Sequence, residues 1–469
     1  MVVQHNMQAA NANRMLNVTT SAQSKSTEKL SSGYRINRAA DDAAGLTISE
    51  KMRKQIRGLD QASTNAQDGV SSVQTAEGAL TEVHSMLQRM NELATQAANG
   101  TNSKDSDRQA IQDEIDQLTT EIDRVSETTK FNETYLLKGE AGTKTINMKA
   151  HDAGLKGTLT DNGDGTATFV MDTLNAGDKV SIGGKQYTIG GKAADVTAAF
   201  GANGLNIDTN HQDVSVNGTT YKWYADTVKT KDNKVISAGY YSQDPSTLAD
   251  QAAATATSVG GAATTSADTL AANAPHGSTI TVGSKSVTLM QDDGAKGGTA
   301  NDEIDDVDST VISKTKAYEL ASKELLAANQ IGDTKGNATV TKADGTTKLD
   351  ATNGDGTFKI KVGQAEVANS LSFSLHVGAD ADMTNKIQVN IDAMDSASLG
   401  IKGLNVKDAS GNAATYAVDA ISDAISKVSS QRSSLGAVQN RLEHTINNLD
   451  NVVENTTTAE SRIRDTDMA

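Results

Sequence analysis

The most constraining feature of this sequence is a long aliphatic stripe near its C-terminal end. Apolar residues recur there at spacings of three and four, with Arg432, Gln439 and Glu460 at skipped positions: Ile421, Ile425, Val428, Leu435, Leu442, Ile446, Leu449, Val453 and Ile463. The spacing predicts one helix of about forty residues or more, longer than globular helices usually are. A helix with one narrow apolar face needs partners along its whole length, because it is marginal alone in water.

Two further stripes of the same period lie in the N-terminal third of the chain. The first comprises Ile56, Leu59, Ala66, Val70, Val73, Leu80, Leu87 and Ala94, widened by Val83 and Met90, and the second comprises Ile111, Ile115, Leu118, Ile122 and Val125. Helices with such stripes pack side by side through them. We therefore expect chain ends about 300 residues apart to meet in one elongated antiparallel bundle.

The central part of the chain has a pattern typical of β-structure. Residues 140–395 hold 28 of the 39 glycines and both prolines. Apolar and polar residues alternate around a glycine-containing turn in three stretches, which predicts hairpins over 178–190, 214–224 and 278–290. The string NGDGT occurs twice before similar strand patterns, and helical patterns cover 246–257 and 314–329. One or two β-rich lobes projecting from the bundle would account for this region.

Bulk composition argues against several classes of function. Only 36% of the residues are apolar and 3% aromatic, so thick globular cores are not expected. The formal net charge of −16 would repel phosphate backbones and anionic lipid surfaces, so we expect neither a nucleic-acid nor a membrane partner. The sequence has no cysteine and no apolar run long enough to span a membrane. Its start lacks the pattern of a secretory signal, so any export would use another route.

A polar segment interrupts the helical pattern within residues 30–59. It carries two arginines, two aspartates and two glycines without a sustained apolar face: Gly33, Arg35, Arg38, Asp41, Asp42 and Gly45. Arg38 and Asp42 are four residues apart and would form a local ion pair on a helix. The pattern is equally compatible with charged contacts to a neighbouring molecule.

Five stretches of the two chain ends together form a specific signature. They are LSSGYRINRAADDAAGLTISEKM (30–52), LQRMNELATQAANGTNS (87–103), EIDRVSETTKFNETYLL (121–137), LHVGADADMTNKIQVNI (375–391) and LGAVQNRLEHTINNLDNVVENTTTAESRIRDTDMA (435–469). In this order they resemble bacterial flagellin, the subunit of the flagellar filament. The resemblance implies a structural, extracellular subunit that polymerises for motility. It also implies export through the flagellar channel without a cleaved signal peptide, with other flagellin subunits, the export apparatus and the filament cap as partners.

The stripes and the resemblance together predict an α+β fold, in which an elongated antiparallel helical bundle carries inserted β-rich lobes. The expected divisions are an inner helix (1–40), a polar spoke (41–55), the first part of the rod (56–139), variable outer lobes (140–370), the second part of the rod with a β-hairpin and the long helix (371–455), and the start of a terminal helix (456–469). The resemblance implies that Arg35, Arg38, Asp41 and Asp42 contact neighbouring subunits, with Gly33 and Gly45 permitting bends.

Flagellins continue beyond the stretch that resembles residues up to Ala469 with a terminal helix that pairs with the inner one. Without that helix, Met7, Leu16, Val18 and Leu30 lack an apolar partner. This predicts disorder over 1–40 in an isolated molecule and no ordinary filaments from the sequence as given.

A second expected surface lies on the helix predicted beyond residue 56. Arg89, Leu93 and Gln96 share a face rotated about 115° from the apolar stripe. In flagellins the matching surface binds the vertebrate Toll-like receptor 5, so the resemblance implies a receptor-binding set of Gln88, Arg89, Glu92, Leu93, Gln96, Ile111 and Glu114. The alternative is that Leu93 only widens the face packed against another helix.

No catalytic or metal-binding set is predicted. The seven histidines are scattered without an HExxH motif, and Gly183-Gly184-Lys185 lacks phosphate-loop spacing and predicts a hairpin turn. The acidic run 301–308 does not fit a calcium loop, so a solvated loop is favoured. We therefore expect no enzymatic activity, cofactor or metal. The competing interpretation is an adhesive or signalling coiled-coil surface protein with a glycan-binding central lobe.

Overall fold

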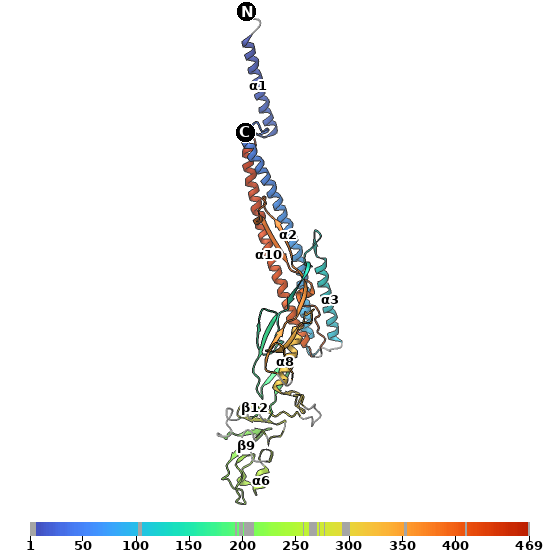
Figure 1. Cartoon of the computed structure of the whole chain (residues 1–469), viewed down its shortest axis with the longest axis vertical. Helices are drawn as coiled ribbons and strands as arrows, with labels where there is room; N and C mark the ends of the chain where they lie inside the picture. The colour runs from blue at the N-terminus through green and yellow to red at the C-terminus, as the bar shows by residue number, and fades with distance from the viewer. Residues whose placement is uncertain are drawn as a thin grey trace.

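The molecule is a long rod with β-rich lobes at one end and a single helix at the other (Figure 1). The computed structural model describes residues 6–101, 106–192, 195–196, 200, 211–256, 258–261, 270–271, 273–275, 277–292, 301–350, 354–408 and 410–467. The predicted α+β class, with helical chain ends around a β-rich middle, is confirmed.

Three helices form the rod: α2 (Ala43–Ala97), α3 (Asp107–Thr128) and α10 (Asn412–Arg464). α2 and α10 have 55 and 53 residues, so each is about 80 Å long. They lie side by side and run in opposite directions (Figure 1). The predicted pairing of the distant chain ends is therefore confirmed.

Polar contacts mark the register between α2 and α10. Going along α2, their partners step backwards along α10: Ser49 Oγ donates to Glu460 at 2.7 Å, Ser63 Oγ donates to Asp450 at 3.1 Å, and Glu77 pairs with Arg432 at 3.6 Å. Both serines are buried. A shift of register would leave their hydroxyls without acceptors, so these contacts favour one alignment of the two helices.

The aliphatic stripes form the core of the rod. Fully buried residues come from all three helices: Val73, Leu80, Leu87, Ile115, Ile122, Val428 and Leu435. Burying one such side chain contributes about 1.5–3 kcal/mol relative to leaving it exposed. This repeated burial explains how helices that are polar on most of their surface are stable in contact.

A β-hairpin of β17 (Leu371–His376) and β18 (Lys386–Ile391) lies against α2. The contact is close at Gly69, where an added Cβ atom would lie 2.2 Å from Cδ1 of Leu375 and 3.3 Å from Cδ1 of Leu442. At Gly78, in the same helix, an added Cβ atom would meet nothing within 4 Å. The two glycines therefore form a matched pair for testing the packing of the hairpin against α2.

Replacing Gly78 with alanine is expected to stabilise the rod by about 0.5–1 kcal/mol, because glycine is a poor helix former. Gly69→Ala should lose that gain and destabilise the rod by about 1 kcal/mol, because the leucines above it must move. Urea unfolding followed by circular dichroism measures both. Equal stabilisation of the two variants would show that the hairpin does not seat on Gly69.

The central region forms two lobes beyond the end of the rod, each with its own core (Figure 1). The inner lobe has a sheet in the order β14 (Thr339–Lys342), β15 (Thr357–Lys361), β5 (Thr166–Met171) and β4 (Gly157–Asp161), with α8 (Lys314–Asn329) packed against it. The outer lobe has a sheet in the order β10 (Gly239–Tyr241), β9 (Thr219–Tyr224), β8 (Val214–Val216), β11 (Thr279–Val282) and β12 (Lys285–Thr288).

Smaller elements complete the described fold. Three smaller sheets are also present. In one of them, β7 (Lys185–Ile189) lies between β6 (Lys179–Ile182) and β13 (Val311–Ile312) and pairs with both. In the other two, β3 (Glu140–Asn147) pairs with β16 (Gln364–Asn369), and β1 (Lys130–Phe131) pairs with β2 (Thr134–Tyr135). The short helices are α6 (Gln251–Ala256), α9 (Ser396–Leu399), η1 (Pro245–Thr247), η2 (Val259–Gly261) and η3 (Met383–Asn385).

The three predicted hairpins are confirmed as β6–β7, β8–β9 and β11–β12. Their turns use left-handed backbone at Gly183-Gly184 and at Asn217-Gly218, as two-residue hairpin turns require. The two NGDGT strings precede β5 and β15, which are neighbouring strands with Phe169 opposite Phe358.

The two predicted central helices differ in outcome. The helix predicted over 314–329 is confirmed as α8. The helix predicted over 246–257 is wrong in extent, because a 3₁₀ turn ends at Leu248 and only Gln251–Ala256 is α-helical. Its single buried residue, Ala254, provides no apolar face to support a longer helix. Residue 257 lies outside the described residues.

Helix α1 (Met7–Ser32) stands apart from the rod and has no buried residue (Figure 1). The structure gives this stretch as a helix, in which Asn6 caps the first turn and Gly33, at φ +73°, caps the last, and disorder over 1–40 in an isolated molecule stays a prediction. Met7, Leu16, Val18 and Leu30 are all exposed on this helix.

Candidate functional surfaces

Both chain ends meet where α1 joins α2. The backbone N–H of Arg35 donates to the carbonyl of Arg464 at 2.7 Å, and the N–H of Thr466 donates to the carbonyl of Gly33 at 2.9 Å. The Arg35 guanidinium also donates to the carbonyl of Ile463, at the end of α10. A short antiparallel tie therefore links the base of α1 to the end of α10.

The predicted ion pair between Arg38 and Asp42 is wrong. Arg38 instead makes a bidentate pair with Glu28 at 3.0 and 3.1 Å, because the chain turns back at Gly33 and brings the two side chains together. Asp42 Oδ1 accepts from Gly45 N at 2.9 Å and caps the N-terminus of α2. The side chain of Arg38 is still 72% exposed.

Asp41 holds the turn between α1 and α2. Its Oδ2 accepts from the backbone N–H groups of Arg38 at 2.9 Å and Asn37 at 3.2 Å. These donors, the Arg38 N–H first, lower the pKa of the Asp41 carboxyl below its usual value. Each of the four charged residues predicted at subunit contacts thus has a role within the chain, and their contacts to neighbouring subunits stay a prediction.

Most of the segment expected to form a polar spoke over 41–55 is helical, because α2 begins at Ala43. Asp42 accepts a hydrogen bond from a backbone N–H group of the first turn, and Ser49 packs against α10. The irregular connection is confined to about ten residues between Ser32 and Ala43. The sequence did not predict this part of the helix, because it carries no sustained apolar stripe.

Five of the predicted receptor-binding residues form an exposed patch on α2 and α3. Arg89 Nε donates to Glu114 at 2.8 Å, and Arg89 Nη1 donates to Glu92 at 3.3 Å; Gln88 and Gln96 lie exposed on the same stretch of α2. The hydrogen bond that Arg89 donates to Glu114, and then the one that it donates to Glu92, raise the pKa of Arg89 above its usual value. The two carboxylates hold the guanidinium across the boundary of the two helices.

The other two predicted receptor-binding residues are not surface residues. Leu93 is 2% exposed and Ile111 is 6% exposed, and both belong to the core of the rod. The reason is that α3 covers the face of α2 that carries Leu93. Leu93 therefore lies on a packed face, as the alternative interpretation expects, and its part in receptor binding stays a prediction.

Sequence reasoning missed Arg108, which is 2% exposed. Its guanidinium donates to the carbonyls of Ala97 at 2.9 Å, Asp408 at 2.7 Å and Asn99 at 3.4 Å. It therefore joins the end of α2, the start of α3 and the segment before α10. One signal was present, since an arginine in the first turn of a helix is unfavourable for the helix dipole unless it has another role.

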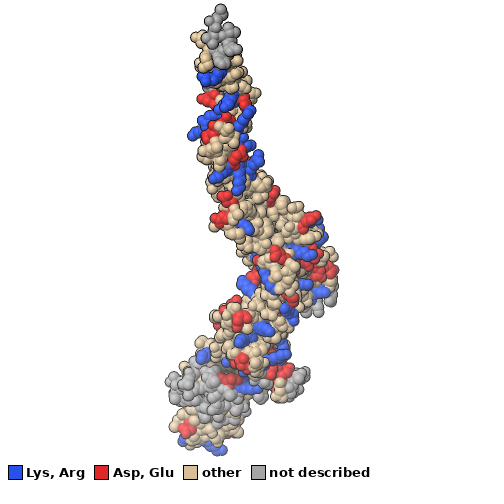
Figure 2. All heavy atoms as spheres, turned by 45° about the horizontal axis from the view of Figure 1, so that its top comes forward, with Lys and Arg blue, Asp and Glu red and all other residues tan. Residues whose placement is uncertain are grey.

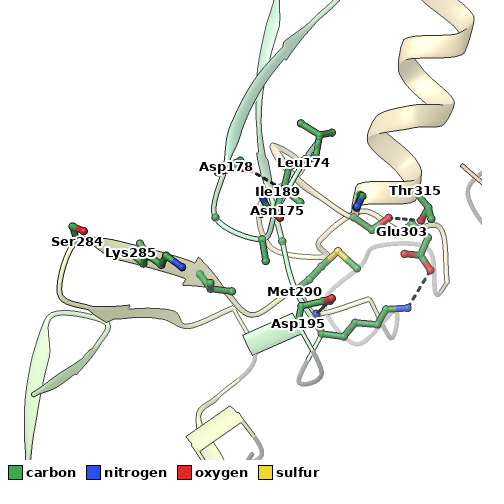
Figure 3. A pocket seen from close by; sticks show the side chains of 18 residues that line it. Leu174, Asn175, Asp178, Ile189, Asp195, Ser284, Lys285, Met290, Glu303 and Thr315 are labelled. Carbon is green, nitrogen blue, oxygen red and sulfur yellow. Dashed lines mark hydrogen bonds and ion pairs between the residues drawn. The ribbon is translucent and has the colours of Figure 1, made fainter. Parts of the chain in front are cut away.

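A cavity of about 930 Å³ lies at the junction of the inner and outer lobes (Figure 3). Ser284 and Lys285 line the side formed by the outer lobe, away from Asp178 and Glu303, and Lys192 Nζ lies 3.2 Å from Glu303 (Figure 3). These polar side chains do not converge on one point as a nucleophile and its base would.

The surface of the shaft carries charges of both signs. Lys and Arg are interspersed with Asp and Glu along the shaft on the face drawn in Figure 2. Among the described residues, no group of three or more His, Asp or Glu is placed to hold a metal ion. None of the described helices combines the length and the hydropathy that a membrane span requires.

Comparison with known proteins identifies the family. The bacterial flagellin N-terminal helical region matches residues 3–142, and the C-terminal helical region matches residues 418–469. A flagellin of Clostridium tyrobutyricum is 36% identical over 100% of this chain and 93% of its own length. The chain belongs to the bacterial flagellin family. Flagellin C of Vibrio anguillarum is 32% identical over 100% of this chain and 90% of its own length. A flagellin of Bacillus subtilis (strain 168) is 60% identical over 30% of this chain and 46% of its own length.

Membership of the flagellin family gives the role of the rod. The chain is a structural subunit that polymerises with its own copies into the extracellular filament of the bacterial flagellum, for motility. The expectation of a non-enzymatic protein agrees with this structural family.

Proposed function

We propose that monomers of this flagellin are also ligands of Toll-like receptor 5, through the patch formed by Gln88, Arg89, Glu92, Gln96 and Glu114. The observation that carries the proposal is the exposed Arg89 guanidinium, held by Glu114 at 2.8 Å. An arginine already fixed in place loses little side-chain entropy on binding, which favours it as an interface anchor. Leu93 supports this surface from beneath, within the core.

Arg89→Ala is expected to weaken receptor binding about tenfold or more, because truncation removes an interface anchor. Arg124→Ala is the matched control, since Arg124 is an exposed arginine on α3 that also pairs with a glutamate, Glu121. A binding titration of both variants with the receptor ectodomain measures the effect. Equal affinities for the two variants would remove the patch from the receptor interface.

Leu93 needs a separate interpretation in that experiment. Because its side chain is buried, Leu93→Ala is expected to destabilise the rod through a cavity and to affect binding only indirectly. Thermal unfolding by circular dichroism therefore accompanies the titration of this variant.

We further propose that Arg35, Arg38, Asp41 and Asp42 contact neighbouring subunits in the filament. Support comes from the exposure of Arg38 and from the position of these residues at the junction of both chain ends. We also propose export through the flagellar channel without a cleaved signal peptide, with the export apparatus and the filament cap as partners. The absence of cysteine and the 3% aromatic content agree with a chain that is exported unfolded.

A further inference from the structure

A second cavity, of about 300 Å³, lies at the root of the inner lobe against α10. Its wall is largely aliphatic, with side chains from four parts of the chain: Ile146, Met148, Ile331, Leu399 and Ala420. Its polar lining includes Lys427 and Asp423 from α10, Ser398 from α9, and His151. An apolar wall with a few polar groups is the usual construction of a small-ligand site.

Lys427 is the polar group of this cavity that most needs a partner. Its Nζ donates to the carbonyl of Ser398, and among the described residues it makes no other hydrogen bond and no ion pair. An ammonium has three N–H donors, so two are left without a protein acceptor. Burial lowers the pKa of Lys427, which shows that the surroundings disfavour its charge.

Two other polar groups, Ser398 and Asp423, help to determine which ligand the cavity can bind. Ser398 is 3% exposed, and its Oγ has no hydrogen-bond partner among the residues that the structure describes. Asp423 forms no ion pair with Lys427: its Oδ1 pairs with Lys149 at 2.9 Å, and its Oδ2 lies 3.5 Å from His151 without a hydrogen bond among the described residues. The cavity therefore offers a partly buried cation and a buried hydroxyl to a ligand with acceptor atoms and a negative charge.

We propose that this cavity binds a small aliphatic carboxylate, with its oxygens on Lys427 Nζ and Ser398 Oγ and its chain against the aliphatic wall. A carboxylate supplies acceptors for both groups and a negative charge next to the partly buried ammonium. Because the walls come from α10, α9 and the strand leading into the inner lobe, a bound carboxylate would join the rod to the lobe at this point.

Calorimetric titration of the full chain with butyrate, valerate and hexanoate tests the proposal, with butyramide and valeramide as uncharged counterparts. Saturable binding of the carboxylates and none of the amides is expected. Lys427→Met should weaken carboxylate binding about tenfold or more, because it removes a charged hydrogen bond and keeps the length of the side chain. Ser398→Ala should weaken it several-fold.

Lys407→Met is the matched control, since Lys407 is an exposed lysine outside the cavity, and it should bind as the parent does. Circular dichroism of each variant checks that α10 is intact. Absence of saturable carboxylate binding by the parent chain overturns the proposal. Binding of amides as tightly as carboxylates, or unchanged affinity of a folded Lys427→Met variant, overturns the role given to the ammonium.

Discussion

Replacing Arg108 with methionine is expected to lower the free energy of unfolding by about 1–3 kcal/mol, because it removes charged hydrogen bonds and leaves neutral acceptors without a donor. The substitution leaves three backbone carbonyls, those of Ala97, Asn99 and Asp408, without their donor inside the fold. The bond to Ala97 is buried and the other two are partly buried, so the carbonyl of Ala97 carries the largest desolvation cost once its donor is removed. The loss should appear in urea unfolding followed by the helical signal.

Two further variants separate geometry from charge. Arg108→Lys keeps the positive charge, but an ammonium lacks the planar fork of donors with which the guanidinium reaches three carbonyls. An intermediate loss of unfolding free energy is therefore expected. Arg124→Met, on the exposed side of the same helix, should unfold at the same urea concentration as the parent within error, because surface ion pairs contribute little. Similar midpoints for Arg108→Met and Arg124→Met would contradict the buried role of Arg108.

The aliphatic stripes made the rod predictable from sequence. Leu80, Leu87, Leu435 and Leu442 are fully buried at the positions that a three-four spacing assigns to one face. The hairpin turns were predictable for an equally local reason, since Asn217-Gly218 adopts the left-handed backbone that few other residue pairs tolerate. Periodicity and turn chemistry are properties of neighbouring residues, so they can be read without knowing the fold.

The errors occur where a distant part of the chain decides the environment. Leu93 lies off the main stripe of α2 but belongs to the core of the rod, in a cluster that includes Ile111 and Ile115 of α3. Arg38 finds Glu28 rather than Asp42 because the chain reverses at Gly33. Arg108 is similar, since one of its acceptors is 300 residues away at Asp408. Such contacts depend on tertiary packing, which no local pattern encodes.

The charge swap Arg38→Glu is expected to abolish sedimentable filaments while the circular dichroism of the monomer stays unchanged. The reason for an intact monomer is that Arg38 is largely exposed, and an exposed ion pair such as that with Glu28 adds little to stability. Loss of assembly would then come from repulsion across a subunit contact, where like charges are costly. Arg35→Glu/Arg38→Glu should act in the same direction.

The double swap Glu28→Arg/Arg38→Glu distinguishes the two roles of Arg38, because it restores the ion pair within the chain with its polarity reversed. If Arg38 contacts a neighbouring subunit, the double variant still fails to assemble. If its pair with Glu28 at 3.0 Å is what assembly needs, filaments return. Sedimentation and electron micrographs of the single and double variants distinguish these outcomes. Recovery of filaments in the double variant would mean that Arg38 acts through its ion pair within the chain, at the base of α1, and not through a neighbouring subunit.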